Sequence, residues 1–107
     1  MARDPGPARH EVPEIDAAAL EAARWAEKAL DAARDRGADR WVGYLASLPD
    51  RLRDDPLPQL RSAARLLRSA YGPKDSIRDG LSEEVTEPLL VAIDRLLKAI
   101  AKYEANR

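Results

Sequence analysis

The residues that could do chemistry are mostly acids and bases, because the chain has no cysteine and a single histidine. That histidine, His10, lies in an N-terminal segment that has three prolines and no apolar period, so it is badly placed to join a Ser-His-acid triad. The lack of cysteine excludes disulfides and thiolate metal sites. The five glycines are scattered, and they form neither a Gly-x-x-x-x-Gly-Lys nor a Gly-x-Gly-x-x-Gly phosphate-binding loop. The composition predicts that the protein is not an enzyme and uses no cofactor.

Carboxylate pairs are the remaining candidates for metal binding or for base catalysis. The pairs are Asp54 with Asp55, Glu83 with Glu84, and Asp75 with Asp79. Adjacent carboxylates on a helix point in different directions, and the segment around Asp75 lacks the ligand order of an EF-hand, so we expect no metal site. One enzymatic alternative stays open, in which Asp79 or Glu87 is a base and an arginine stabilises negative charge.

A run of basic side chains is the strongest local charge cluster. It consists of Arg61, Arg65, Arg68, Lys74 and Arg78. The i, i+4, i+7 spacing of the first three places them on one face of a helix. This face is either solvated and paired with acids such as Asp31 and Asp35, or a docking surface for an acidic protein partner. The net charge of -1 and the few aromatic residues argue against nucleic acid; weak nucleic-acid or anion binding remains an alternative.

The first two helices are predicted from apolar residues at helical spacing. The first begins near residues 14–16 and ends at Gly37, and its apolar stripe is made mostly of alanine. The second begins with Asp39 as N-cap and is kinked or split at Pro49. Trp25, at the edge of the alanine stripe, either supplies packing or is an exposed anchor for a partner.

The third and fourth helices hold the basic cluster between them. The third has Asp55 as N-cap and Pro56 at its first position, and it runs to about Tyr71. The fourth is the most apolar and starts either after Ser82 or at Pro88. Short loops between the four helices predict an antiparallel bundle.

The loop over residues 72–79 connects the two most apolar helices. Gly72 is expected to provide a left-handed helix stop. Ser76 and Asp79 have the spacing of an N-cap and its acid at the third helical position. This loop either only closes the hairpin between the two helices or belongs, with the basic face, to the partner-binding site.

Two sequence features resemble a known group of proteins: a Trp-x-x-x-Leu helix, and an aromatic residue followed by Gly-Gly-Met-Gly-Ser-x-x-Asp. The matching residues are Trp41, Leu45, Tyr71, Gly72, Ser76 and Asp79. Pro73, Lys74 and Asp75 stand where the second motif has Gly, Met and Gly. Over roughly residues 16–103 the chain thereby resembles small, all-helical, functionally uncharacterised bacterial proteins, some of which are similar to immunity proteins. The resemblance implies a protein partner, and for immunity-like members that partner is a toxin.

Taken together, the sequence predicts an all-α antiparallel bundle of about four helices over residues 14–107, preceded by a disordered tail over residues 1–13. No apolar run approaches the ~20 residues of a membrane span. The N-terminus has no apolar signal segment, so we expect a cytoplasmic protein. The leading hypothesis is a non-enzymatic protein-binding module, and the alternative is a homodimer formed through the alanine-rich face of the first helix.

Overall fold

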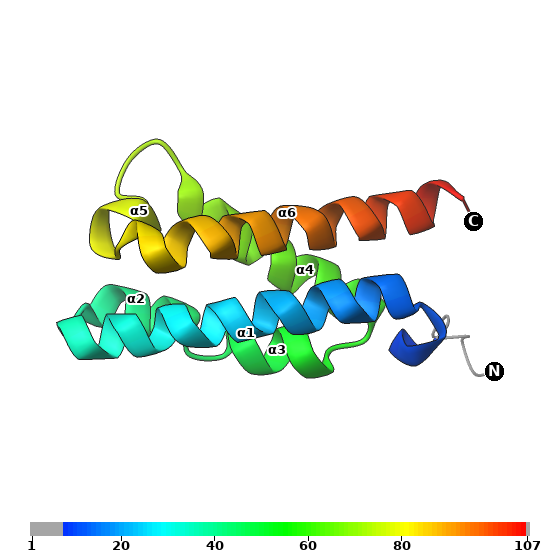
Figure 1. Cartoon of the computed structure of the whole chain (residues 1–107), viewed down its shortest axis with the longest axis horizontal. Helices are drawn as coiled ribbons and strands as arrows, with labels where there is room; N and C mark the ends of the chain where they lie inside the picture. Colours follow the sequence, from blue (N-terminus) through cyan, green and yellow to red (C-terminus); the bar gives the residue numbers. More distant parts are fainter. Residues whose placement is uncertain (1–7, 107) are drawn as a thin grey trace.

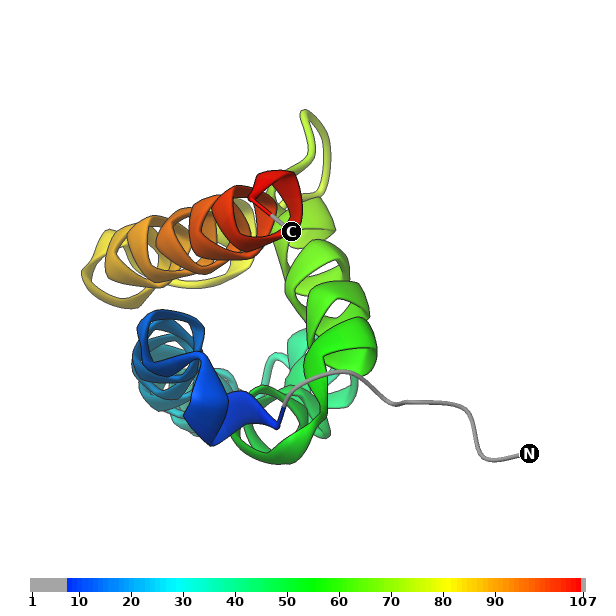
Figure 2. The same cartoon turned by 90° about the vertical axis from the view of Figure 1, so that its right-hand side faces the viewer.

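The chain folds as an all-α antiparallel bundle, as the sequence predicts (Figure 1). The computed structural model describes residues 8–106, and no strand occurs among them. The helical elements are η1 (Arg9–Glu11), α1 (Pro13–Arg36), α2 (Asp39–Leu45), α3 (Leu48–Asp54), α4 (Leu57–Arg68), η2 (Ser69–Tyr71), α5 (Ile77–Gly80) and α6 (Glu83–Ala105). Seen end-on, α1, α3, α4 and α6 surround a common centre (Figure 2).

The first turn of the bundle follows from the backbone of Gly37. Gly37 is left-handed (φ 67°), and its N–H donates to the carbonyls of Ala33 and Arg34, which ends α1 as predicted. The chain turns so tightly that Ala38 takes the N-cap position of α2 and Asp39 becomes the first helical residue. The prediction of Asp39 as N-cap is therefore wrong by one residue.

Proline divides the second predicted helix. α2 ends at Leu45 and α3 begins at Leu48, with Pro49 at the second helical position, where its missing N–H has no helical partner to lose. Next, Pro56 rather than Asp55 is the N-cap of α4. Asp55 instead ends α3: its N–H donates to the Arg51 carbonyl, and its carboxylate lies 3.1 Å from Arg51 Nε.

The last helix starts after Ser82, which is one of the two predicted starts. Pro88 therefore lies inside α6, and the carbonyl of Glu84 has no helical N–H donor at that turn. The predicted end of the third helix is also close, because α4 continues through η2 to Tyr71.

Alanine lets α1 approach its neighbours closely. The buried alanines of its stripe are Ala19, Ala22, Ala23, Ala26, Ala29 and Ala33, each at most 1% exposed. They pack mainly against α6 and α3, and leucine and isoleucine side chains fill the rest of the core. This face is therefore covered within one chain, and a homodimer through it stays a prediction.

The segment before α1 is fixed by Arg9. The Arg9 side chain is only 10% exposed, its Nη2 lies 3.0 Å from Asp16 Oδ1, and its Nη1 donates to the Asp55 carbonyl at 3.2 Å. The predicted disordered tail is therefore too long, because residues 8–12 contact the bundle and Pro13 already belongs to α1. The rest of that prediction, residues 1–7, lies outside the described part of the chain. Among the described residues, no helix has the length and apolar content to cross a membrane.

Candidate binding surface

Two arginines of the predicted stripe join α4 to α6. Arg61 Nη1 lies 3.0 Å from Glu104 Oε2, and Arg68 Nε lies 3.0 Å from Asp94 Oδ1. Because the earlier arginine meets the later acid, the two helices run antiparallel. Both pairs are about two-fifths exposed on the arginine side, so they are worth little individually in stability.

The predicted pairing of this stripe with Asp31 and Asp35 is wrong. Asp31 lies 3.7 Å from Arg34 in its own helix, and Asp35 is exposed. The physical reason is the packing order: α4 packs against α6 and α3, while the charged face of α1 points away from the core.

The middle arginine of the stripe is different. Arg65 is exposed, and within residues 8–106 no carboxylate lies within 4.0 Å of it. Its exposed side chain lies between two arginines that are held in place by α6. Lys74 is likewise exposed, in the loop that projects from the bundle between η2 and α5 (Figure 1). Neither cation pairs with a carboxylate in the described part of the chain, so both can contact an outside partner.

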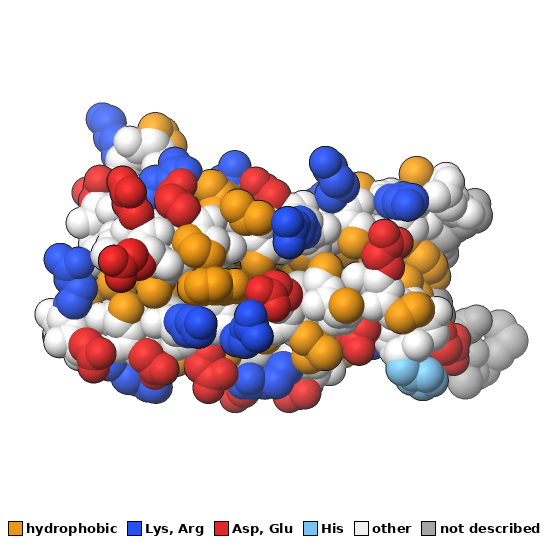
Figure 3. Space-filling model, viewed as in Figure 1, with side chains coloured by type: hydrophobic (Ala, Val, Ile, Leu, Met, Phe, Trp, Pro, Cys, Tyr) orange, Lys and Arg blue, Asp and Glu red, His pale blue; other side chains and the backbone are white. Residues whose placement is uncertain are grey.

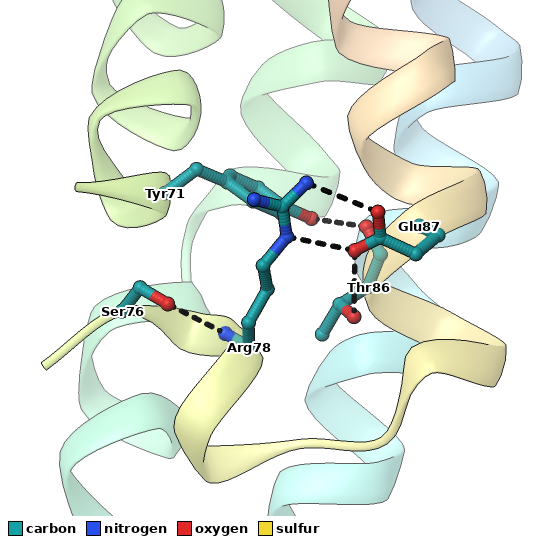
Figure 4. Close-up of polar contacts among 5 residues, drawn as sticks. All are labelled: Tyr71, Ser76, Arg78, Thr86 and Glu87. Atoms are coloured by element: carbon teal, nitrogen blue, oxygen red, sulfur yellow. Dashed lines mark hydrogen bonds and ion pairs between the residues drawn. The ribbon is translucent and has the colours of Figure 1, made fainter. Parts of the chain in front are cut away.

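Arg78 joins α5 to the N-terminal part of α6, close to Tyr71 (Figure 4). Its Nε and Nη2 donate to the two carboxylate oxygens of Glu87 at 2.9 and 3.0 Å. The same guanidinium lies 5.5 Å from the ring centre of Tyr71, and Arg68 lies 5.9 Å from it. The Tyr71 hydroxyl donates to the carbonyl of Thr86 at 2.5 Å, so the ring is clamped between helices.

These contacts set the ionisation of the cluster. The hydrogen bonds from Arg78 lower the pKa of Glu87, and the carboxylate in turn raises the pKa of Arg78. Burial raises the pKa of the Tyr71 hydroxyl, and the nearby charge of Glu87 adds to the effect. A carboxylate with a lowered pKa and both oxygens engaged is a poor general base, which disfavours Glu87 for the enzymatic alternative.

The loop forms the predicted capping box but not the predicted stop. Ser76 Oγ accepts from the Arg78 N–H at 3.1 Å, and Asp79 Oδ2 accepts from the Ser76 N–H at 3.2 Å. Gly72 is extended (φ -65°), so the prediction that it is left-handed is wrong. The left-handed residue of this loop is Asp75, with φ 50°. Ser76 and Asp79 are thus engaged in shaping the loop.

Sequence reasoning considered Glu87 only as a possible base, and it missed Asp94, Glu104 and three further cations of α6. Glu87, Asp94 and Glu104 lie on the side of α6 that faces α4 and α5. Asp94 and Glu104, the partners of Arg68 and Arg61, lie ten residues apart while the two arginines lie seven apart, so no matching spacing in the sequence signalled these pairs. The missed cations are Arg95, Lys98 and Lys102, all exposed and spaced i, i+3, i+7 on α6.

No protein family, curated protein or solved structure matches the chain. Within residues 8–106, no three side chains of the kinds that bind metals are grouped to hold an ion. Any inference about function must therefore start from the side chains along the contact between α4 and α6.

Proposed function

We propose that the protein is a non-enzymatic binding module that docks an acidic protein partner on the arginine face of α4. The observation that carries the proposal is Arg65, an exposed guanidinium that has no carboxylate partner within residues 8–106 and is flanked by Arg61 and Arg68. In the bundle, the contacts to α6 reduce the freedom of the flanking side chains. Binding a partner then costs less conformational entropy, because these arginine side chains are already partly ordered.

The ion pairs of the flanking arginines leave binding capacity. A guanidinium has five N–H donors, and Arg61 and Arg68 each use one of them on α6. The other donors can reach carboxylates of a partner, and Arg is well suited to recognise them bidentately. Lys74 adds a positive charge from the projecting loop, and Arg78, Ser76 and Asp79 hold that loop in shape.

The resemblance to small helical proteins supports a protein as the partner and makes a toxin the first class to test. An immunity-type protein would need no catalytic group, only a surface complementary to its target. Complementary charge raises the rate of association and favours the correct partner. Weak nucleic-acid or anion binding at the same arginines is the competing function.

The test is affinity capture from the native host's lysate with the wild type and an Arg65→Glu variant. The matched control is Arg24→Glu, an equal change of charge at an exposed position of α1. A protein retained by wild type and control but lost by Arg65→Glu supports the proposal. A partner that all three retain shows that the arginine face is not the contact, and capture of nucleic acid alone favours the competing function.

A further inference from the structure

We propose that a second copy of this chain packs on the outer face of α1 and α6, with the two copies of α6 antiparallel and Val91 of each copy at the two-fold axis. This contact uses the exposed sides of the two helices and leaves the buried alanine stripe of α1 in the core. It is independent of the proposed function, because α4 lies on the other side of the bundle from this face (Figure 2).

The centre of this face is apolar. Val91 of α6 is 51% exposed, more than the other large hydrophobic side chains that reach the surface of the described chain. Trp25 of α1 is partly buried: its Nε1 donates to Glu21 at 3.0 Å, and Lys28 Nζ lies 4.3 Å from its ring centre. An exposed apolar side chain beside a tryptophan is typical of the centre of a protein–protein contact.

A pocket between α1 and α6 shows that Trp25 and Val91 belong to the same face. Glu14 of α1 and Lys102 of α6 both line this pocket. Trp25 comes eleven residues after Glu14, and Val91 comes eleven residues before Lys102, which is about three helical turns in each case. Because α1 and α6 run antiparallel (Figure 1), both steps lead in the same direction from the pocket. Trp25 and Val91 therefore lie at the same level of one face.

The charges along this side of α6 change sign from one end to the other. Helical spacing places five exposed side chains on one strip, in the order Glu84, Val91, Arg95, Lys98 and Lys102. In the described chain none of the four charged ones takes part in an ion pair. Figure 3 shows acidic side chains near the start of α6, basic ones over its C-terminal half and hydrophobic ones between them.

This order of charges makes the strip complementary to its own reverse. Glu84 lies seven residues before Val91, and Lys98 lies seven residues after it. In an antiparallel pair with Val91 at the two-fold axis, Glu84 of each copy therefore faces Lys98 of the other copy. The face of α1 has the same order, since Glu21 precedes Trp25 and Lys28 follows it.

The same order of charges argues against other occupants. A uniformly acidic partner, a nucleic acid or an anionic membrane would be attracted by Lys98 and Lys102 but repelled by Glu84 and Glu21. A uniformly basic partner would be repelled by the cations. A second copy alone presents the matching charges by symmetry. Because one strip from each of two helices makes a small contact, we expect a weak dimer with a Kd of about 10–100 µM at low salt.

Sedimentation equilibrium of the full chain tests whether the dimer forms. Between about 5 and 500 µM, the mean mass should rise from that of one chain towards that of two, and about 1 M salt should weaken the association. A protein that stays monomeric over this range at low salt overturns the inference.

Charge reversal tests the pairing of Glu84 with Lys98. Glu84→Lys and Lys98→Glu should each raise the Kd of the dimer by about tenfold, from about threefold at each of the two symmetric contacts. The double variant reverses both contacts and restores the attraction, so its Kd should return to near the wild-type value. The matched control is Asp54→Lys, an equal change at an exposed position of α3, which should dimerise nearly as the wild type does. A double variant as weak as the single variants would show that α6 does not pair in this register.

A mixture of the two single variants gives a second test of the same contact. Glu84→Lys has a lysine at both positions and Lys98→Glu has a glutamate at both, so each variant repels itself and attracts the other. An equimolar mixture should form dimers at concentrations at which either variant alone is monomeric. A mixture of Asp54→Lys with Lys98→Glu has the same net charges and should not. Equal dimerisation of both mixtures would mean that only net charge matters, and the inference fails.

A substitution at the two-fold axis tests the apolar centre. Val91→Glu brings two carboxylates together in the dimer and should leave the protein monomeric up to about 500 µM. The control is Leu20→Glu on α1, also an exposed apolar position (46% exposed), which the helix period places well away from Trp25. Circular dichroism checks that each variant remains folded. A Val91→Glu protein that still dimerises like the wild type would overturn the inference.

Discussion

Replacing Gly80 by alanine should destabilise the protein, because Trp41 packs directly on the glycine. A Cβ atom built at residue 80 would lie 2.6 Å from Trp41 Cδ1 and in closer overlap still with Nε1, whereas ordinary contacts begin near 3.4 Å. The ring or α5 would have to move by about 1 Å. Trp41 is only 5% exposed and stacks edge-on against Tyr44 at 5.4 Å, so it has little room to move.

The expected cost follows from overpacking. Forcing extra atoms into a packed site costs about 1–3 kcal/mol, and the better helix propensity of alanine offsets at most about 1 kcal/mol. The matched control is Gly43→Ala in α2, where the new Cβ has no atom within 4 Å. That variant should be more stable than the wild type by about 0.5–1 kcal/mol, because glycine in a helix is costly.

Urea denaturation, followed by circular dichroism, measures the free energies of unfolding of both variants. For a domain of this size, each 1 kcal/mol corresponds to about 4–8 °C in Tm. A Trp25→Phe background isolates the fluorescence of Trp41, whose emission should change in Gly80→Ala and stay as in the wild type in Gly43→Ala. A Gly80→Ala protein as stable as the wild type, with unchanged emission, would refute this account of the contact.

Three further perturbations test the clamp and the loop. Tyr71→Phe removes the hydroxyl that donates to Thr86 and should lower the free energy of unfolding by about 1 kcal/mol in urea denaturation; an unchanged value contradicts a bond made inside the core. Asp75→Gly should raise the Tm, since glycine adopts a left-handed backbone more easily by about 0.5–1 kcal/mol; a lower Tm would show that the Asp75 side chain stabilises the loop. Because the pKa of Glu87 is lowered in the folded protein, its pairing with Arg78 stabilises the fold fully above the unfolded pKa of about 4.3 and loses that effect as pH falls through the folded value. The stability difference between wild type and Glu87→Gln should therefore shrink between pH 6 and pH 3, and a difference that grows over this range reverses the sign of the argument.

The helices could be predicted from the sequence because apolar spacing and capping residues are local signals. The alanine stripe of α1, its stop at Gly37 and the capping box at Ser76 all depend on residues within one or two turns. Errors arose where neighbouring elements compete for one residue. Asp is a residue type favoured at N-caps, yet Asp55 pairs with Arg51 at the end of α3.

Long-range partners could not be predicted because they depend on the register of packed helices. The arginine stripe was visible, but whether Arg61 faces α1 or α6 is decided by the packing of the whole bundle. Arg9 shows the same limit, since its partner carbonyl at Asp55 is 46 residues away in the sequence. Of the candidate site, the cations of α4 and of the 72–79 loop were therefore predictable, while their division into paired and unpaired side chains within the described residues was not.

The most extensive helix contact joins α1 to α6, the first and last long helices of the chain. During synthesis, the alanine stripe of α1 is made before its main cover, α6, which follows only after α2 to α5. The contact also requires closure of a long loop, which costs entropy before any of the buried surface is gained. We therefore expect a nascent chain that lacks α6 to stay unfolded or to be held by chaperones, and the core to form in a single late step when the C-terminal helix becomes available.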